Sequence, residues 1–243
     1  MPTPSTPTYS TRALVLKRSP YRAFDTLVTA YSRDKGKLRF LIRGGLKFNS
    51  KMSAHSEPFN LVDLMIIAGR RDYAASLVSQ RVYACLKSDY EKLEAAGYAL
   101  SSFNKLIKED VQDPHLFDHA LDFLTFLDKT EANREVYQFL SYVFLLKVLK
   151  HLGYGLDHLN CRQCQKALGE NTYLLPKEGG WFCADCSLSF EKDLSLVINL
   201  KSLFLLRKTQ DSSFLALPDL TIVSHDIIVL NKALKEWLDY LIE

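Results

Sequence analysis

Lys37-Leu-Arg-Phe-Leu-Ile-Arg43 places cationic side chains at three of its odd positions and apolar side chains at its even positions. Successive side chains of a β-strand point to opposite faces, so the run predicts a strand with one buried and one charged face. The buried face is expected to hold Leu38, Phe40 and Ile42. The charged face is expected to hold Lys37, Arg39 and Arg43.

Further runs with strand character lie on either side of this one. Together with the central run, the strand candidates cover residues 13–17, 26–31, 37–43, 59–67 and 73–80. Turn residues such as Asp34-Lys-Gly36 and Gly44-Gly45 separate them. Five short strands in about 70 residues have the size of a small closed barrel such as the OB-fold. A small SH3-like barrel fits the strand count nearly as well.

The period of the apolar residues becomes helical after the strands. From Tyr90 onward, apolar side chains recur at three- and four-residue steps, which places them on one face of a helix. Asp113-Pro114 has the form of an N-cap followed by proline in the first turn of the next helix. The helices are expected at about residues 90–107, 113–129, 131–152, 193–208 and 226–242.

These patterns predict an α+β, multidomain chain. A proline-rich disordered tail at residues 1–10 precedes an OB-fold β-barrel at residues 11–82. An α-helical domain follows at residues 83–243, and a four-cysteine segment is inserted into it at residues 160–189.

The cysteines of that segment have metal-ligand spacing. Cys161-Arg-Gln-Cys164 and Cys183-Ala-Asp-Cys186 form two C-x-x-C pairs with 18 residues between them. Each pair allows one tight turn to aim both sulfurs at a single point, and two such turns complete a tetrahedron. Thr172 to Leu175 is a strand candidate before a Gly-Gly turn, so a hairpin would bring the pairs together.

The pattern predicts one Zn²⁺ ion held by Cys161, Cys164, Cys183 and Cys186. Four thiolates leave no position for an activated water, so the predicted site is structural and not catalytic. The competing interpretations are two reactive dithiols, an iron–sulfur cluster, or cysteines that only pack. Cys85 lies outside the pattern.

The N-terminal part carries the chain's positive charge. Of 31 Lys+Arg and 28 Asp+Glu, residues 1–81 hold 14 and 5, which leaves 17 and 23 for the rest. This asymmetry indicates that the barrel meets a polyanion. The candidate phosphate contacts are Lys37, Arg39, Arg43, Lys47 and Lys51. Phe48 is a candidate for stacking on a base. The alternative is a solvated strand face whose lysines prevent edge aggregation.

Other function classes receive no support from the sequence. The phosphate-binding, dinucleotide-binding, zinc-protease and nucleophile-elbow motifs are all absent, so we expect neither an enzyme nor a small-molecule substrate. The start of the chain lacks the apolar core of a secretory signal, and the most apolar run is too short for a membrane span. A cytoplasmic protein that does not contact a membrane is therefore expected.

The order of these parts resembles the RecO family of bacterial recombination mediators and DNA repair proteins. The run from Gly36 to Gly45, followed by Glu57-Pro-Phe59, looks like the family's central barrel strands. His151-Leu-Gly-Tyr-Gly155 and Gly179-Gly180, each before a C-x-x-C pair, look like its helix end and zinc segment. The resemblance spans about residues 10–190, and residues 190–243 carry no distinctive motif.

The resemblance implies a cytoplasmic, nucleoid-associated protein that binds single- and double-stranded DNA and anneals complementary strands. It also implies three partners: RecR, the acidic C-terminal tail of the single-strand-binding protein and, indirectly, the recombinase RecA. Arg134 is the candidate cation for binding that tail. The leading hypothesis is thus a non-enzymatic mediator of recombination and repair. The alternatives are a zinc-ribbon module that binds RNA or protein without annealing, and an enzyme whose site the sequence does not reveal.

Overall fold

The chain divides into two compact units in this computed structural model, which describes residues 7–109, 111–156, 159–190, 196–214 and 224–242. The first unit contains residues 1–88 and 104–128, and the second contains residues 89–103 and 129–243. The division therefore differs from a single boundary after residue 82. The reason is that residues 104–128 return to the barrel, where Lys37 donates hydrogen bonds to the carbonyls of Asn104 and Ile107.

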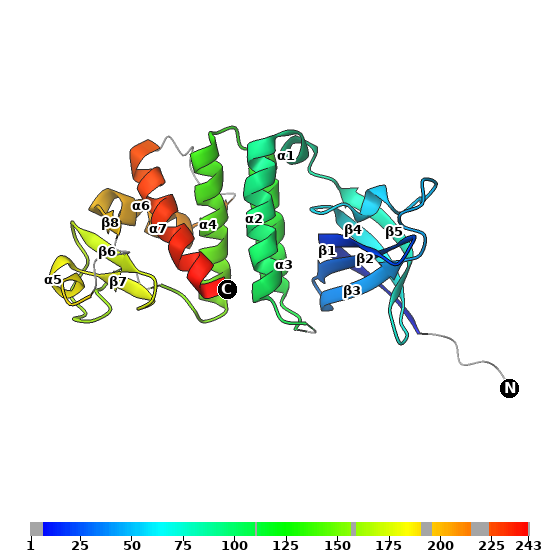
Figure 1. Cartoon of the computed structure of the whole chain (residues 1–243), viewed down its shortest axis with the longest axis horizontal. Helices are drawn as coiled ribbons and strands as arrows, with labels where there is room; N and C mark the ends of the chain where they lie inside the picture. The colour runs from blue at the N-terminus through cyan, green and yellow to red at the C-terminus, as the bar shows by residue number, and fades with distance from the viewer. Residues whose placement is uncertain (1–6, 110, 157–158, 191–195, 215–223, 243) are drawn as a thin grey trace. The chain divides into compact units, whose positions relative to one another are not determined.

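The first unit contains a closed five-stranded barrel (Figure 1). Its strands are β1 (Thr8–Tyr21), β2 (Asp25–Ser32), β3 (Gly36–Ile42), β4 (Leu61–Ile67) and β5 (Tyr73–Arg81). They follow one another around the barrel in the order β1-β2-β3-β5-β4, and β4 closes onto β1. β3 and β5 pair in parallel at Leu41 and Tyr73. This is the topology of the OB-fold, which decides between the two barrels that the strand count allowed.

The side-chain alternation expected of β3 is confirmed. Phe40 and Ile42 are buried in the barrel core, and Leu38 packs against the same cluster. The rest of the cluster comes from the other four strands and consists of Ala13, Val15, Val28, Ala30, Val62, Leu64, Ile66 and Leu77. The odd-numbered side chains of β3 consequently lie on the outside of the barrel.

β1 begins earlier than the sequence indicated. Thr8, Tyr9 and Ser10, which were expected in the tail, pair with Ile67, Ile66 and Met65 of β4. The strand extends this far because β4 offers backbone partners up to Ile67, and Pro7 accepts a further hydrogen bond from the N–H of Ala68. The remainder of the expected tail, residues 1–6, lies outside the described residues.

Two helices of the first unit follow the barrel along the chain: α1 (Ala84–Ser88) and α3 (Pro114–Lys129). The predicted cap of α3 is confirmed, because Asp113 accepts hydrogen bonds from the backbone N–H groups of His115 and Leu116. A single-turn 3-10 helix, η1 (Ala54–Ser56), lies between β3 and β4. Cys85 is exposed on α1.

The helices of the second unit surround α4 (Arg134–His151). α4 begins at the cap Asn133, which accepts from the N–H of Val136, and not at residue 131 as expected. It contacts α6 (Leu200–Asp211) and α7 (Ser224–Ile242). The residues of α2 (Tyr90–Leu106) up to Phe103 belong to the same unit, and Phe103 packs against Phe144 of α4. α4 is buried along nearly its whole length, as its apolar sequence predicted.

One predicted helix begins too early. Residues 196–198, expected within a helix from residue 193, form β8 (Leu196–Ile198), while residues 193–195 lie outside the described part. β8 pairs with β6 (Thr172–Leu175), which also pairs with β7 (Gly180–Phe182). Leu-Val-Ile is a run that a sheet edge favours, and the helix starts only after Asn199, which caps it through the N–H of Ser202.

Candidate metal centre and nucleic-acid interface

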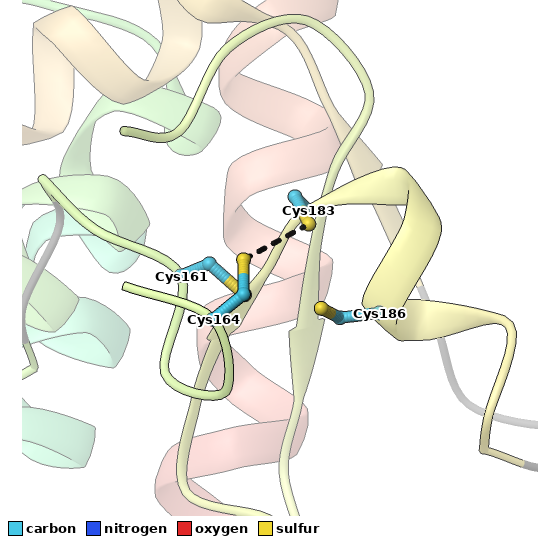
Figure 2. A group of neighbouring side chains, drawn as sticks. All are labelled: Cys161, Cys164, Cys183 and Cys186. Atoms are coloured by element: carbon cyan, nitrogen blue, oxygen red, sulfur yellow. Dashed lines mark hydrogen bonds between the residues drawn. The ribbon is translucent and has the colours of Figure 1, made fainter. Parts of the chain in front are cut away.

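The four cysteines of the two C-x-x-C pairs meet at one place in the second unit (Figure 2). Their sulfur atoms all lie within 4.8 Å of one another, and no other cluster with metal-ligand geometry occurs in the part of the chain that the structure describes. Cys161 is buried, Cys164 is exposed, and Cys183 and Cys186 are intermediate. The protein therefore shields the cluster at Cys161, and Cys164 is open to solvent.

The first pair lies in a tight reversal of the backbone. The N–H of Cys161 donates to the carbonyl of Lys166 at 2.8 Å, and the N–H of Gln165 donates to the carbonyl of Cys161 at 2.9 Å. Gln165 has a φ of 61°, which lets the chain turn back within this short segment. Both sulfurs therefore face the same point, as the spacing predicted.

The second pair follows the expected hairpin of β6 and β7. Cys183 precedes α5 (Ala184–Ser187), a single turn of helix that carries Cys186. The N–H of Arg162 donates to the carbonyl of Trp181 at 2.8 Å and so joins the two turns. A Cβ atom at Gly180 would lie 2.6 Å from the side chain of Arg162, so this position excludes larger residues.

The sulfur positions fit a tetrahedral metal ion. With metal–sulfur bonds of about 2.3 Å, neighbouring sulfurs of a regular tetrahedron are separated by about 3.8 Å. The Cys164 and Cys183 sulfurs are 3.8 Å apart. Burial opposes ionisation of the Cys161 thiol, yet the N–H groups of Cys164, Cys183 and Gln163 lower its pKa to about 6. Desolvation and the neighbouring thiols raise the pKa of Cys186. A bound cation would favour the ionised form of Cys186, because its charge offsets that of the neighbouring sulfurs.

The cationic row of β3 does not lie free on the barrel surface. Lys37 is buried, since its ammonium group donates to the carbonyls of Asn104 at 2.6 Å and Ile107 at 3.4 Å. This burial lowers the pKa of Lys37. Arg39 is exposed but forms an ion pair with Glu109 at 2.8 Å. The expectation that Lys37 points into solvent was wrong, because residues 104–109 cover that part of the strand.

Replacing Lys37 by Met should therefore lower stability more than it changes nucleic-acid binding. Removal of the ammonium group leaves two carbonyls at the end of a helix without their donor, which costs about 1–3 kcal/mol of unfolding free energy. Urea unfolding followed by circular dichroism measures this loss. Lys35→Met, at an exposed lysine of the same turn, is the control and should cost little. If the Lys37→Met variant is as stable as the wild-type chain but binds single strands more weakly, Lys37 belongs to the nucleic-acid interface after all.

The other predicted barrel residues are exposed. Phe48 is fully exposed in the loop after β3, and Lys51 is exposed in the same loop. The ammonium group of Lys47 lies 5.6 Å from the ring centre of Phe24, which is also exposed. Arg43 lies over the ring of Tyr73 at 4.0 Å. Of the six predicted barrel residues, all except Lys37 are therefore accessible.

Arg43 lines a hollow of about 640 Å³ on the barrel surface. The hollow lies between the loop joining β1 to β2 and the loop joining β4 to β5. It is lined by Tyr21, Arg22, Asp25, Leu41, Arg43, Ile67, Ala68, Gly69, Arg70, Arg71 and Tyr73. A second hollow of about 400 Å³ shares part of this wall and adds Arg39. We call the two hollows together the arginine groove. Loops in these two positions form the ligand face of OB-folds.

The arginines of the larger hollow have no carboxylate partner in the part of the chain that the structure describes. Among the described residues, Arg22, Arg43, Arg70 and Arg71 form no ion pair. Arg71 and Arg22 lie 5.3 and 5.5 Å from the ring centre of Tyr21. Elsewhere on this unit, acidic partners neutralise Arg12, Arg18, Arg33 and Arg39. Unneutralised guanidinium groups beside aromatic rings are suited to an anion that also carries planar groups.

Sequence reasoning missed most of this groove. Arg22, Arg70 and Arg71 lie in loops more than 40 residues apart, and only the closed barrel brings those loops together. The sequence did contain a signal, because Gly69-Arg-Arg71 is a basic turn directly before a strand. The pairing of that turn with the turn at Arg22 is a property of the tertiary fold.

Comparison with known families identifies the chain. Residues 87–243 match the family described as "Recombination protein O C terminal". The chain belongs to the RecO family. Residues 6–79 match the corresponding "Recombination protein O N terminal" family, so the barrel and the helical region are both accounted for.

Curated RecO proteins are similar over most of the chain. A "DNA repair protein RecO" of Syntrophomonas wolfei subsp. wolfei is 30% identical over 238 residues, which cover 96% of this chain and 87% of the relative. The protein of the same name from Cutibacterium acnes is 31% identical over 185 residues, 74% of each chain. That of Clostridium novyi is 27% identical over 179 residues, 73% of this chain and 69% of the relative.

The predicted tail-binding residue of this RecO-family chain is held by an acidic partner. Arg134 forms two hydrogen bonds with Glu94, at 2.9 and 3.1 Å, and both side chains are partly exposed. No helix in the described ranges is both long enough and apolar enough to cross a membrane.

Proposed function

We propose that this RecO-family chain binds single-stranded DNA in the arginine groove and acts as a mediator of DNA repair and homologous recombination. The observation that carries the proposal is a set of four arginines that line a hollow at the two loops that bind oligonucleotides in OB-folds and that form no ion pair with any described residue. The name that the relatives share, DNA repair protein RecO, supports DNA as the polyanion.

The groove offers both kinds of contact that a single strand uses. Guanidinium groups bind phosphates and release counterions, which gives affinity without sequence preference. Tyr21 and Tyr73 supply aromatic rings, and Phe24 and Phe48 are exposed in the loops after β1 and β3. Aromatic faces of this kind stack on unpaired bases. We propose that a strand runs from Arg43 toward Arg39. Arg39 forms an ion pair with the exposed Glu109, and a phosphate can displace this carboxylate at small cost.

Annealing follows from the same charges. Two complementary strands repel each other until cations screen their phosphates. Lys47 and Lys51 are exposed in the loop after β3 and are the proposed contacts of a second strand or of a duplex. The chain then promotes pairing without catalysing covalent chemistry.

The metal centre has a structural part in this proposal. We propose one Zn²⁺ held by the four cysteines, because a closed set of thiolates is typical of structural zinc. The cations near it give less support to nucleic-acid binding there, since Arg162 is occupied by the carbonyl of Gly179 at 3.0 Å. No observation on the described residues therefore supports the alternative, a zinc-ribbon module that recognises RNA or protein.

The proposed partners follow the family. We propose that the chain works with RecR, binds the acidic tail of the single-strand-binding protein, and helps load RecA onto DNA coated by that protein in the nucleoid. Arg134 remains the candidate for the tail. Its exposed ion pair with Glu94 would have to exchange one carboxylate for another.

A strand-annealing assay tests the proposal. Two complementary oligonucleotides, one with a fluorophore and one with a quencher, should anneal several times faster with the protein than without it at about 50 mM salt. The acceleration should decline as salt is raised, because counterion release drives the contacts. Non-complementary strands serve as the control. Annealing at the uncatalysed rate, with no single-strand binding at low salt, would remove the proposed function.

A further inference from the structure

Asp25 is an acidic residue in the wall of the larger hollow of the arginine groove. It stands at the start of β2, and its neighbours in that wall include Arg22, Arg43, Arg70 and Arg71. A carboxylate weakens phosphate binding in such a place, because it opposes the charge of the arginines. Asp25 must therefore have another role than attracting the phosphates of a nucleic-acid strand.

The carboxylate is held in place but is only partly used. Oδ1 accepts a hydrogen bond from the backbone N–H of Gly44 at 2.8 Å, which ties the start of β2 to the loop after β3. Within the described residues, the Asp25 carboxylate forms no other hydrogen bond and no ion pair. None of the surrounding arginines comes within 4.0 Å of it, although they line the same hollow. One oxygen is therefore left as an acceptor in a fixed position.

Bases differ in what they offer to such an acceptor. At neutral pH an aspartate only accepts hydrogen bonds. Cytosine presents an exocyclic amino group as a donor, and aspartate or glutamate is its usual acidic partner. Thymine and uracil present a carbonyl oxygen at the matching position, which a carboxylate repels, and their one donor on this edge, the ring N3–H, lies between two such oxygens. In a single strand these edges are not paired with another base and remain available to a protein.

We propose that Asp25 makes the groove selective, favouring bases with an exocyclic amino group over thymine and uracil. This inference rests on the proposed function, since it needs a strand in the groove. The arginines then hold phosphates without regard to sequence, and Asp25 adds the preference. Strands rich in thymine bind more weakly at this position although their charge is the same.

Oligonucleotides of deoxycytidine and deoxyuridine test the proposal. Strands of about 12 nucleotides match the size of an OB-fold site. The two pyrimidines carry the same charge and have nearly the same size, and both lack a methyl group. They differ at ring positions 3 and 4, where cytosine has an acceptor nitrogen and an amino group, and uracil has an N–H and a carbonyl oxygen. Fluorescence anisotropy should show the wild-type chain binding the cytidine strand about fivefold more tightly, or more, the lower end of the effect of a specific base contact.

Asp25→Asn should abolish the preference. The amide keeps an oxygen for the N–H of Gly44 but also presents donors to uracil, so the two affinities should agree within about twofold. Both affinities should rise, because a negative charge leaves the groove. Asp63→Asn is the matched control. Asp63 lies on β4, lines neither hollow and forms an ion pair with Arg12, so its change should leave the ratio unaltered.

The outcomes separate this inference from the proposed function. Salt-dependent binding of both strands with equal affinity by the wild-type chain overturns the role of Asp25 and leaves DNA binding intact. A preference that survives Asp25→Asn, or that disappears in Asp63→Asn instead, also overturns it. Absence of binding to either strand overturns the proposed function together with the inference.

Discussion

Replacing Cys161 by Ser should release the metal ion and unfold the segment that the two C-x-x-C pairs organise. Cys161 is the fully buried cysteine of the cluster, and a serine hydroxyl cannot replace its thiolate as a zinc ligand. Structural zinc contributes about 10–16 kcal/mol to folding in small metal-dependent modules. That is as large as the whole stability of a typical domain, about 5–15 kcal/mol. The small sheet of β6, β7 and β8 cannot compensate for such a loss.

Metal analysis and tryptophan fluorescence measure the effect. The wild-type chain should carry one zinc per chain, and Cys161→Ser should carry well under one equivalent. Trp181 is completely buried next to the cluster, so its emission should shift to longer wavelength when the metal leaves. Single-strand binding by the barrel should persist, because the barrel closes through its own strands.

The control uses a cysteine that is not a predicted ligand. Cys85 is exposed on α1, and Cys85→Ser should change neither the metal content nor the emission. Full metal retention in Cys161→Ser, or iron with visible colour in the wild-type chain, would contradict a structural zinc centre.

Replacing Arg22, Arg70 and Arg71 together by Ala should nearly abolish single-strand binding. These side chains form no ion pair among the described residues, so their loss leaves no buried charge behind. Each phosphate contact on a single strand releases about 0.7 counterions, so three lost contacts weaken binding about a hundredfold at 0.1 M salt. Annealing should slow in parallel, since it depends on the same screening. Anisotropy with a labelled strand and the annealing assay report both effects.

A second triple variant controls for net charge. Arg12, Arg33 and Arg81 are exposed arginines of the same unit, held by Asp63, Asp118 and Thr125. Their replacement by Ala removes the same charge from the unit but leaves the groove unchanged. Its single-strand affinity should stay within a few-fold of wild type. Equal losses in both variants would mean that net charge, and not the groove, attracts the strand. Circular dichroism establishes that both variants are folded.

The sequence predicted features that depend on neighbouring residues. The alternation in β3 predicted which of its side chains enter the barrel, because side-chain direction in a strand follows position alone. The spacing of the two C-x-x-C pairs predicted that their four sulfurs lie close together, because each pair lies in one turn. Asp113-Pro114 predicted the start of α3 for the same reason.

Features that depend on distant segments were not predictable in this way. Burial of Lys37 requires residues 104–107, which the fold brings back to the barrel. The arginine groove requires two loops on either side of the parallel pair of β3 and β5. The strand at residues 196–198 forms because β6 offers a free edge, and local sequence alone did not separate it from the helix that follows.

Single-strand affinity measured over a range of salt concentrations shows whether phosphates lie in the arginine groove. The logarithm of the association constant falls linearly with the logarithm of salt concentration, in proportion to the number of phosphates bound. For Arg22→Ala/Arg70→Ala/Arg71→Ala we predict a slope shallower than that of the wild-type chain by about 2, since three contacts of about 0.7 each are lost. The surface control should keep the wild-type slope. A groove variant that stays folded and keeps the wild-type slope would contradict the placement of DNA in this groove.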